Sequence, residues 1–159
     1  MKRIIYPGTF DPIHNGHLDI AKKAAELFDE LILVVAINNE KNPLFSNEDR
    51  MTLIEKSLSK IKNIRVSSFH GLVVDYAKSK EALAIIRGLR HVSDFEFEFQ
   101  MAMMNYNLNP KIKSLFMMPE EKYIHLNSTV IKDVARLGGD ISDYVPKCVE
   151  TALFEKFNN

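Results

Sequence analysis

The sequence contains one cysteine, Cys148, and no tryptophan among its 159 residues. A single cysteine excludes an intramolecular disulfide framework and any zinc site built from cysteine pairs, and it is typical of a chain in a reducing compartment. We interpret Cys148 as a small core residue. The longest apolar run, Leu31 to Ile37, is too short to span a membrane, and the first residues do not resemble a signal peptide. These absences predict a cytoplasmic protein with no membrane partner.

The chain also lacks net charge, because 21 lysines and arginines balance 21 aspartates and glutamates. It therefore has no global positive field of the kind that drives sequence-independent nucleic-acid binding, and we expect no nucleic-acid partner. Any affinity for phosphate has to be local. With 46% hydrophobic and 26% charged residues, the composition is that of an ordered globule. The length predicts one domain, residues 1–159, whose core needs neither a disulfide nor a structural metal.

Short apolar runs alternate with segments of helical spacing along the whole chain. Leu31 to Ile37 is hydrophobic without alternation, which is typical of a strand covered by helices on both faces. Alternating strands and helices imply right-handed crossovers, so we predict an α/β fold: a doubly wound, Rossmann-like, five-stranded parallel sheet with helices on both faces. The expected strands are Lys2 to Tyr6, Leu31 to Ile37, Ile64 to Ser67, Leu83 to Arg87 and Ser114 to Met118. The expected helices follow Gly16 and a capping box at Ser46 and Asp49, and cover Val73 to Lys80, Ser128 to Leu137 and Pro146 to Phe157.

The segment that begins at Ser93 has two interpretations. Phenylalanines at every second position alternate as in a strand, whereas Ser93 with Glu96 is typical of a helix cap; the length of the segment favours a helix. Its large apolar residues are interpreted as core or subunit interface rather than as a cofactor site. These residues are Phe95, Phe97, Met101 and Met104.

In folds of this class, ligands bind beyond the carboxyl ends of the strands. The loop Pro7 to His17 is the most informative, because Gly8 and Gly16 allow a ligand close to the backbone and the following helix start favours an anion. The loop is neither a Walker A nor a GxGxxG motif. His14 and His17 project to the same side, but no third zinc ligand is suggested by spacing. A structural interpretation, in which one histidine caps the helix and the other lies at the surface, stands beside a phosphate-facing role.

The loop sequence GTFDPIHNGH resembles the HxGH signature of the nucleotidylyltransferases. Two further stretches, Ile86 to Arg90 followed by Asp94 to Glu98, and Ser128 to Lys132, resemble signatures of the bacterial phosphopantetheine adenylyltransferases. The resemblance runs in order from Tyr6 to the C-terminal helix. It implies transfer of the adenylyl group of ATP to 4′-phosphopantetheine, which gives dephospho-coenzyme A and pyrophosphate in coenzyme A biosynthesis. It also implies a Mg²⁺ cofactor, a homohexamer and feedback by coenzyme A.

The resemblance further implies roles for particular residues. His17, Lys41 and Arg90 are the implied catalytic residues; His17 stabilises the reacting α-phosphate of ATP and Lys41 bridges the two substrates. The implied phosphopantetheine site consists of Thr9, Lys41, Val73 and Arg87. The implied ATP site consists of Thr9, Phe10, His17, Gly88, Leu89, Arg90, Glu98, Tyr123, Ile124, His125, Leu126, Asn127, Ser128 and Thr129. Asn127 stands where the family frequently has serine, and Tyr123 where tryptophan is frequent.

Several of these residues have a purely structural alternative. Lys41 fits a solvated surface lysine, Arg87 and Arg90 fit salt bridges to Glu96 or Asp94, and Ser128 with Thr129 fits a helix cap. Two other functions also remain open: an enzyme of the same superfamily that uses another phosphorylated acceptor, and a nucleotide-binding sensor without catalysis. No protein carboxylate cluster is expected for a metal, because Mg²⁺ binds largely through phosphates.

Overall fold

The computed structural model describes residues 1–38 and 42–158, and within them it contains every predicted strand. The strands are β1 (Arg3–Gly8), β2 (Glu30–Ala36), β3 (Ile64–Phe69), β4 (Ala84–Gly88) and β5 (Lys113–Met117). The helices are α1 (Asn15–Leu27), α2 (Asn47–Leu58), α3 (Val73–Ser79), α4 (Val92–Leu108), α5 (Ser128–Arg136) and α6 (Lys147–Asn158), with a 3₁₀ turn η1 (Glu121–Tyr123) before α5. None of these helices is long and apolar enough to cross a membrane.

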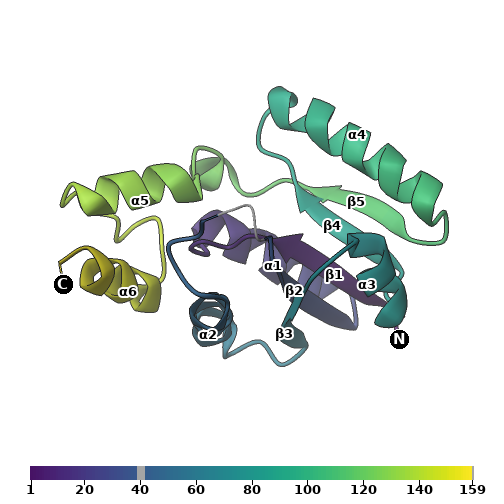
Figure 1. The fold of residues 1–159 in the computed structure, drawn as a ribbon, viewed down its shortest axis with the longest axis horizontal. Coiled ribbons are helices and arrows are strands. Elements are labelled where there is room, and N and C mark those ends of the chain that lie inside the picture. The colour runs from purple at the N-terminus through teal and green to yellow at the C-terminus, as the bar shows by residue number, and fades with distance from the viewer. Residues whose placement is uncertain (39–41, 159) are drawn as a thin grey trace.

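The strands form one parallel sheet in the order β3-β2-β1-β4-β5 (Figure 1). The chain first builds outward from β1 to β3 and then returns to place β4 on the other side of β1, so the strand order switches direction between β1 and β4. This is the predicted doubly wound architecture. It places the candidate ligand site where β1 and β4 end.

The loop after β1 begins later than the sequence suggests. We expected the strand to end at Tyr6, but β1 continues through Pro7 and Gly8, paired with β2. Pairing of β1 with β4 extends only to Ile5 and Ile85. Pro7 is therefore paired on one side only, where a residue without an N–H is tolerated. The two strands separate just before their carboxyl ends.

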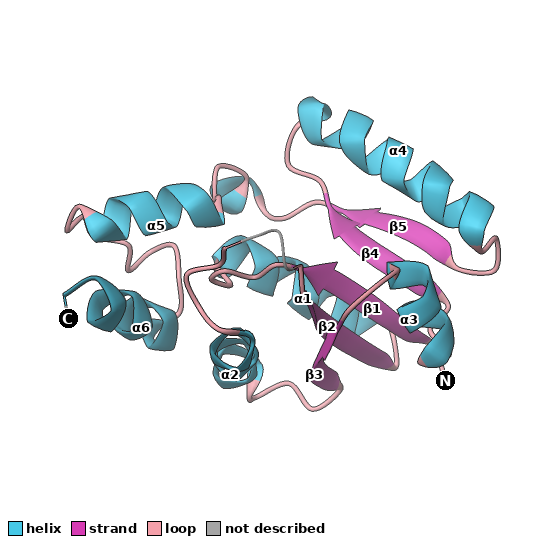
Figure 2. Ribbon diagram, in the orientation of Figure 1, coloured by secondary structure: helices cyan, strands magenta, loops and turns pink. Residues whose placement is uncertain are grey.

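Two hydrophobic clusters cover the two faces of the sheet, because successive side chains of each strand point to opposite faces. On β2, Leu33 belongs to the larger cluster, which packs under α1, α2, α5 and α6, and Val34 to the smaller one under α3. Figure 2 shows helices on both sides of the strands. The middle of β2 is buried on both faces, as its unbroken apolar run predicts. Cys148 packs, half-buried, against the larger cluster.

The ambiguous segment is a helix, α4, but it begins earlier than predicted. His91, not Ser93, is the N-cap, and its N–H donates to the side chain of Asp94 at 3.4 Å. Of the two interpretations of its large apolar residues, core is wrong, because these side chains are exposed in the single chain: Phe95, Phe97, Met101 and Met104. Glu98 is the one buried residue of α4 among those the structure describes. An interface remains the interpretation for the exposed face.

Candidate active site at the carboxyl ends of β1 and β4

A cavity of about 670 Å³ opens where β1 and β4 separate. Its walls come from the loop between β1 and α1, from residues 42–43, from the β4–α4 connection and from the start of α5. Eleven of the predicted site residues line it: Thr9, Phe10, His17, Arg87, Gly88, Arg90, Glu98, Tyr123, Asn127, Ser128 and Thr129. Segments far apart in the sequence therefore meet in one hollow.

The remaining predicted residues that the structure describes do not line this cavity, and their roles stay predictions. Leu89 pairs its N–H with the carbonyl of Met117, and Val73 packs against the smaller hydrophobic cluster at the start of α3. Leu126 is buried, whereas His125 packs edge-on against the ring of Tyr144. Ile124 directly follows η1 and is not among the cavity-lining residues. Lys41 lies outside the described residues.

The two histidines of the loop form a stacked pair at the start of α1. His14 is the N-cap: its Nδ1 accepts a hydrogen bond from the N–H of Gly16 at 3.1 Å. The Nδ1 of His17 accepts from the N–H of His14 at 3.3 Å, and the two rings stack with centroids 3.7 Å apart. Both Nδ1 atoms are acceptors, so each neutral ring carries its hydrogen on Nε2. The cavity-lining His17 therefore keeps an N–H donor for a ligand.

Burial keeps both histidines neutral near pH 7. It lowers the pKa of His14 to about 3, with a smaller contribution from the positive charge of Arg90. Burial also lowers the pKa of His17 well below 6.5, helped by His14, Arg90 and Arg87. The alternative of one capping and one surface histidine is thus half correct. His14 caps the helix, but His17 packs against Phe10, with the two ring centroids 5.1 Å apart. His17 can donate a hydrogen bond at neutral pH without carrying a charge.

Phe10 packs edge-on against His17 of this pair. It is buried, has a positive φ of 49° and meets the ring of Tyr6 edge-on at 5.4 Å. A Cβ atom on Gly8 would lie 2.8 Å from the Phe10 ring, so any larger residue here would force this ring to shift. Close approach of a ligand to Gly8 stays a prediction, and the neighbour in contact with Gly8 in the structure is Phe10.

Arg87, near the end of β4, and Arg90, just after this strand, are both held by carboxylates of α4. Arg87 donates to Glu98 through Nε and Nη2, each at 2.8 Å, and through Nη1 to the carbonyl of Pro7 at 2.9 Å. Arg90 pairs with Asp94 at 3.2 Å and donates to the carbonyl of Leu126 at 2.7 Å. The salt-bridge interpretation is therefore correct for Arg90 and Asp94. For Arg87 the predicted partners, Glu96 and Asp94, are wrong. Arg87 pairs with Glu98, the buried acid of α4, which lies one helical turn beyond Asp94.

All three cations among the described residues of the cavity wall are paired with a carboxylate of the same wall. The pairs are Arg87 with Glu98, Arg90 with Asp94 and Lys132 with Asp11. Burial alone lowers the pKa of Arg87, but the contact with Glu98 outweighs it and raises this pKa. Such pairing is expected, because a partly buried cation needs a partner.

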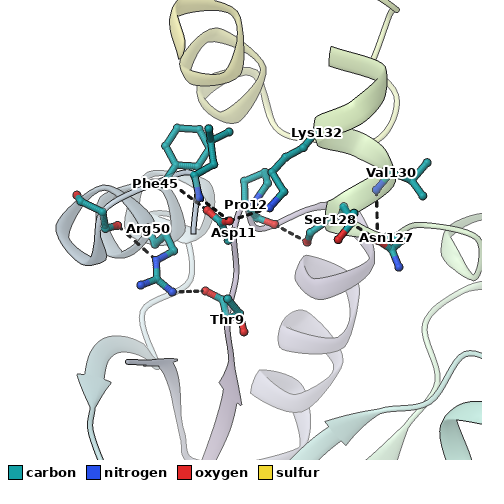
Figure 3. Close-up of polar contacts among 12 residues, drawn as sticks. Thr9, Asp11, Pro12, Phe45, Arg50, Asn127, Ser128, Val130 and Lys132 are labelled. Carbon is teal, nitrogen blue, oxygen red and sulfur yellow. Dashed lines mark hydrogen bonds and ion pairs between the residues drawn. The ribbon is translucent and has the colours of Figure 1, made fainter. Parts of the chain in front are cut away.

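The N–H groups at the start of α5, which borders the cavity, are bonded within a helix cap. Asn127 is its N-cap, with Oδ1 accepting from Thr129 N–H at 2.8 Å and from Val130 N–H at 3.3 Å (Figure 3). The interpretation of Ser128 and Thr129 as the cap is therefore wrong. Ser128 is the first helical residue, and its Oγ donates to the carbonyl of Pro12 at 2.9 Å. Asn127 keeps the helix start at the cavity and ties it to the β1–α1 loop through the next residue.

Three residues of this region were not singled out from the sequence: Asp11, Arg50 and Lys132. Asp11 is buried in the loop, and Arg50 of α2 is also buried and donates to the carbonyl of Thr9 at 2.8 Å. The position of Asp11 between Phe10 and Pro12 is a signal in the sequence, because a carboxylate among apolar residues is buried only when it has a partner. Within residues 1–38 and 42–158, no three acidic, histidine or cysteine side chains gather into a metal-ligand set.

The chain is similar to known proteins over nearly its whole length. The model of the cytidylyltransferase-like family matches residues 5–134. A phosphopantetheine adenylyltransferase from Alkaliphilus oremlandii is 52% identical over 157 residues, which are 99% of this chain and 100% of that protein. One from Caldanaerobacter subterraneus is 49% identical over 157 residues, covering 99% of this chain and 98% of its own.

Among solved structures, one from Vibrio parahaemolyticus, described as a nicotinate-nucleotide adenylyltransferase, has a TM-score of 0.72 over 97% of this chain and 99% of its own. At 20% identity it supports the fold alone. The sequence relatives, by contrast, share about half of their residues with this chain from end to end. The chain belongs to the cytidylyltransferase-like family and, within it, to the phosphopantetheine adenylyltransferases.

Proposed function

We propose that the cavity between β1 and β4 is where this chain transfers the adenylyl group of ATP to 4′-phosphopantetheine, giving dephospho-coenzyme A and pyrophosphate. The observation that carries the proposal is the convergence of the His14–His17 pair, Arg87, Arg90 and the start of α5 on one cavity. The family membership supports it, because the relatives are named for this reaction. The reaction is a step of coenzyme A biosynthesis.

The chemistry is a direct in-line displacement. An oxygen of the phosphopantetheine phosphate attacks the α-phosphorus of ATP, and the bond from that phosphorus to the bridging oxygen of the β-phosphate breaks. Pyrophosphate leaves with the electron pair. A phosphate is ionised near neutral pH, so no general base is needed. The protein contributes positioning and donors aimed at charge that develops on the α-phosphate.

His17 is the proposed donor to the reacting α-phosphate. Its Nδ1 accepts from the backbone of His14, which fixes the ring and leaves the Nε2–H for the ligand. Because its pKa is well below 6.5, this donor keeps the same protonation state across the physiological range. Thr9 is proposed to hold the attacking phosphate, and Lys41, outside the described residues, to bridge the two substrates.

The arginines divide between the substrates in this proposal. Arg87 binds the phosphate of phosphopantetheine, whose arm reaches Val73, and Arg90 binds ATP with Phe10, Gly88, Leu89 and the residues from Tyr123 to Thr129. Glu98, implied in the ATP site, holds both Nε and Nη2 of Arg87. We propose that it acts through that arginine.

Mg²⁺ is the proposed cofactor, and it would supply charge neutralisation on the phosphates. The three carboxylates that line the described part of the cavity are engaged in ion pairs with Arg87, Arg90 and Lys132. This donor set fits an ion that is bound mainly by substrate phosphates and water, as Mg²⁺ usually is.

We also propose that the chain is a homohexamer in the cytoplasm and is subject to feedback by coenzyme A. The support for association is the apolar face of α4, where Phe97 and Met104 are 59% and 57% exposed. Large exposed apolar patches are typical of subunit interfaces. Coenzyme A contains both an adenylyl and a phosphopantetheine group, so the same cavity is its proposed binding site.

Pyrophosphate release tests the proposed function. ATP is supplied with 4′-phosphopantetheine, without an acceptor, and with other phosphorylated acceptors, and CTP is tested as a competing nucleotide. We expect release only with ATP and phosphopantetheine together. Pyrophosphate release with another acceptor would favour an enzyme of the same superfamily that uses that acceptor. ATP binding without any pyrophosphate release would favour a nucleotide-binding sensor.

A further inference from the structure

Asp11 is the point at which three separate segments of the chain meet. Its Oδ1 accepts from the N–H of Phe45 at 2.9 Å, and its Oδ2 accepts from the N–H of Leu44 at 2.8 Å and from Nζ of Lys132 at 2.8 Å. Figure 3 shows these contacts converging from the segment before α2 and from α5. The carboxylate is thus an anchor for the loop that carries Thr9 and Phe10.

Two further hydrogen bonds hold the same loop from both sides. Arg50 of α2 donates to the carbonyl of Thr9 at 2.8 Å, and Ser128 of α5 donates to the carbonyl of Pro12 at 2.9 Å. The loop is therefore fixed to α2 at one end and to α5 at the other, with Asp11 between them bonded to both sides. Positioning of this kind is what a reaction without a general base depends on.

The anchor brings a negative charge into a cavity proposed to bind two anions. Asp11 is 4% exposed and lines the cavity, as does Lys132. Burial on its own raises the pKa of Asp11, but the hydrogen bonds from Lys132, Phe45 and Leu44 outweigh it and hold this pKa below its usual value. The carboxylate therefore stays ionised at neutral pH, and two of its three donors are backbone groups that carry no charge.

We propose that Lys132 is a positioning residue whose task is to cancel the charge of Asp11, so that the loop keeps its carboxylate anchor without repelling ATP. This inference rests on the proposed function, because it takes ATP as the ligand of the cavity. Lys132 acts on substrate binding through Asp11 and makes no phosphate contact of its own.

The proposal makes a specific prediction for a double-mutant cycle. Lys132→Met leaves Asp11 ionised and uncompensated beside the phosphates, and we expect ATP to bind about tenfold more weakly or worse. The double variant, Asp11→Asn with Lys132→Met, has no charge at either position. We therefore expect its ATP affinity to return to within about threefold of the parent. Asp11→Asn alone leaves Lys132 without its counter-charge, so ATP should bind at least as tightly as to the parent. Its kcat should fall, because the amide nitrogen replaces one of the two oxygens that accept a backbone N–H.

Isothermal titration with ATP and steady-state kinetics on the full chain measure these effects, with thermal melts to establish folding. Lys132→Arg keeps the charge and should bind ATP nearly as the parent does. Lys147→Met removes the same kind of charge from an exposed pair with Glu150 on α6 and is the matched control, with no expected effect on ATP affinity.

Each outcome decides the question. Recovery of ATP affinity in the double variant supports the proposal. A double variant as weak as Lys132→Met overturns it and indicates a direct phosphate contact by Lys132. Unchanged ATP affinity in Lys132→Met, with only a lower melting temperature, overturns it in favour of a structural ion pair. Failure of the parent itself to bind ATP would instead contradict the proposed function.

Discussion

The low pKa of His14 makes the stability of the fold depend on pH. In the folded chain this pKa is lowered from 6.5 to about 3 by burial and by Arg90. In the unfolded chain the ring is in water and titrates near 6.5. Below that pH the unfolded state takes up a proton that the folded state does not, so the free energy of unfolding is highest above pH 6.5 and falls as the pH decreases toward 3.

The magnitude follows from these two values. Between pH 7 and pH 5, protonation of one such histidine in the unfolded state lowers the free energy of unfolding by roughly 2 kcal/mol. His17, whose pKa is also lowered well below 6.5, contributes a loss in the same direction. Lowered carboxylate pKa values, such as that of Asp11, add a loss at lower pH. The window from pH 7 to 5 therefore isolates the histidines.

His14→Asn tests this reasoning, because asparagine is a good N-cap and can accept the N–H of Gly16 without titrating. Between pH 7 and 5, we expect the free energy of unfolding of the variant to fall by about 2 kcal/mol less than that of the parent. Urea unfolding followed by circular dichroism, at a fixed protomer concentration, measures the difference. His70→Asn, at an exposed position, is the control. Equal losses in the parent and in His14→Asn would refute the account of a buried neutral histidine pair.

Three further predictions concern the cavity. His17→Ala should lower turnover about 100-fold or more while ATP affinity stays within a few-fold, as expected when one transition-state donor is lost; turnover near the parent rate would remove His17 from the mechanism. Arg87→Ala should mainly weaken phosphopantetheine binding in calorimetry, and a loss of ATP binding alone would reverse the division of the arginines. Gly8→Ala should cost about 1 to 3 kcal/mol of unfolding free energy, because the new Cβ lies 2.8 Å from the Phe10 ring; an unchanged melting curve would contradict it.

The framework of the fold could be predicted because its signals are local. Leu31 to Ile37 is apolar without alternation because both faces of β2 are covered, and this burial shows in the sequence itself. The start of α4 could not be placed, because its cap is His91, a residue outside the usual group of capping side chains. The exposed phenylalanines of α4 were open to two interpretations for a related reason, since sequence does not show what covers a helix face.

The charge balance of the site could not be predicted, since it depends on which side chains meet in space. Asp11 and Lys132 are 121 residues apart and come together only once α5 packs over the β1–α1 loop. Arg87 finds Glu98 rather than the nearer Asp94 because α4 turns Glu98 inward. The motif residues lead to the cavity, whereas the partners that position them become visible only in the folded chain.

The central claim is that this cavity joins ATP to phosphopantetheine by attack at the α-phosphorus. The most direct measurement supplies ATP with a radioactive α-phosphorus and follows the label after a single turnover with 4′-phosphopantetheine. The account predicts that the label appears in dephospho-coenzyme A, with one unlabelled pyrophosphate released for each molecule formed, and that His17→Ala abolishes both within the same time. Label in a phosphate product other than dephospho-coenzyme A, or no transfer at all, would contradict it.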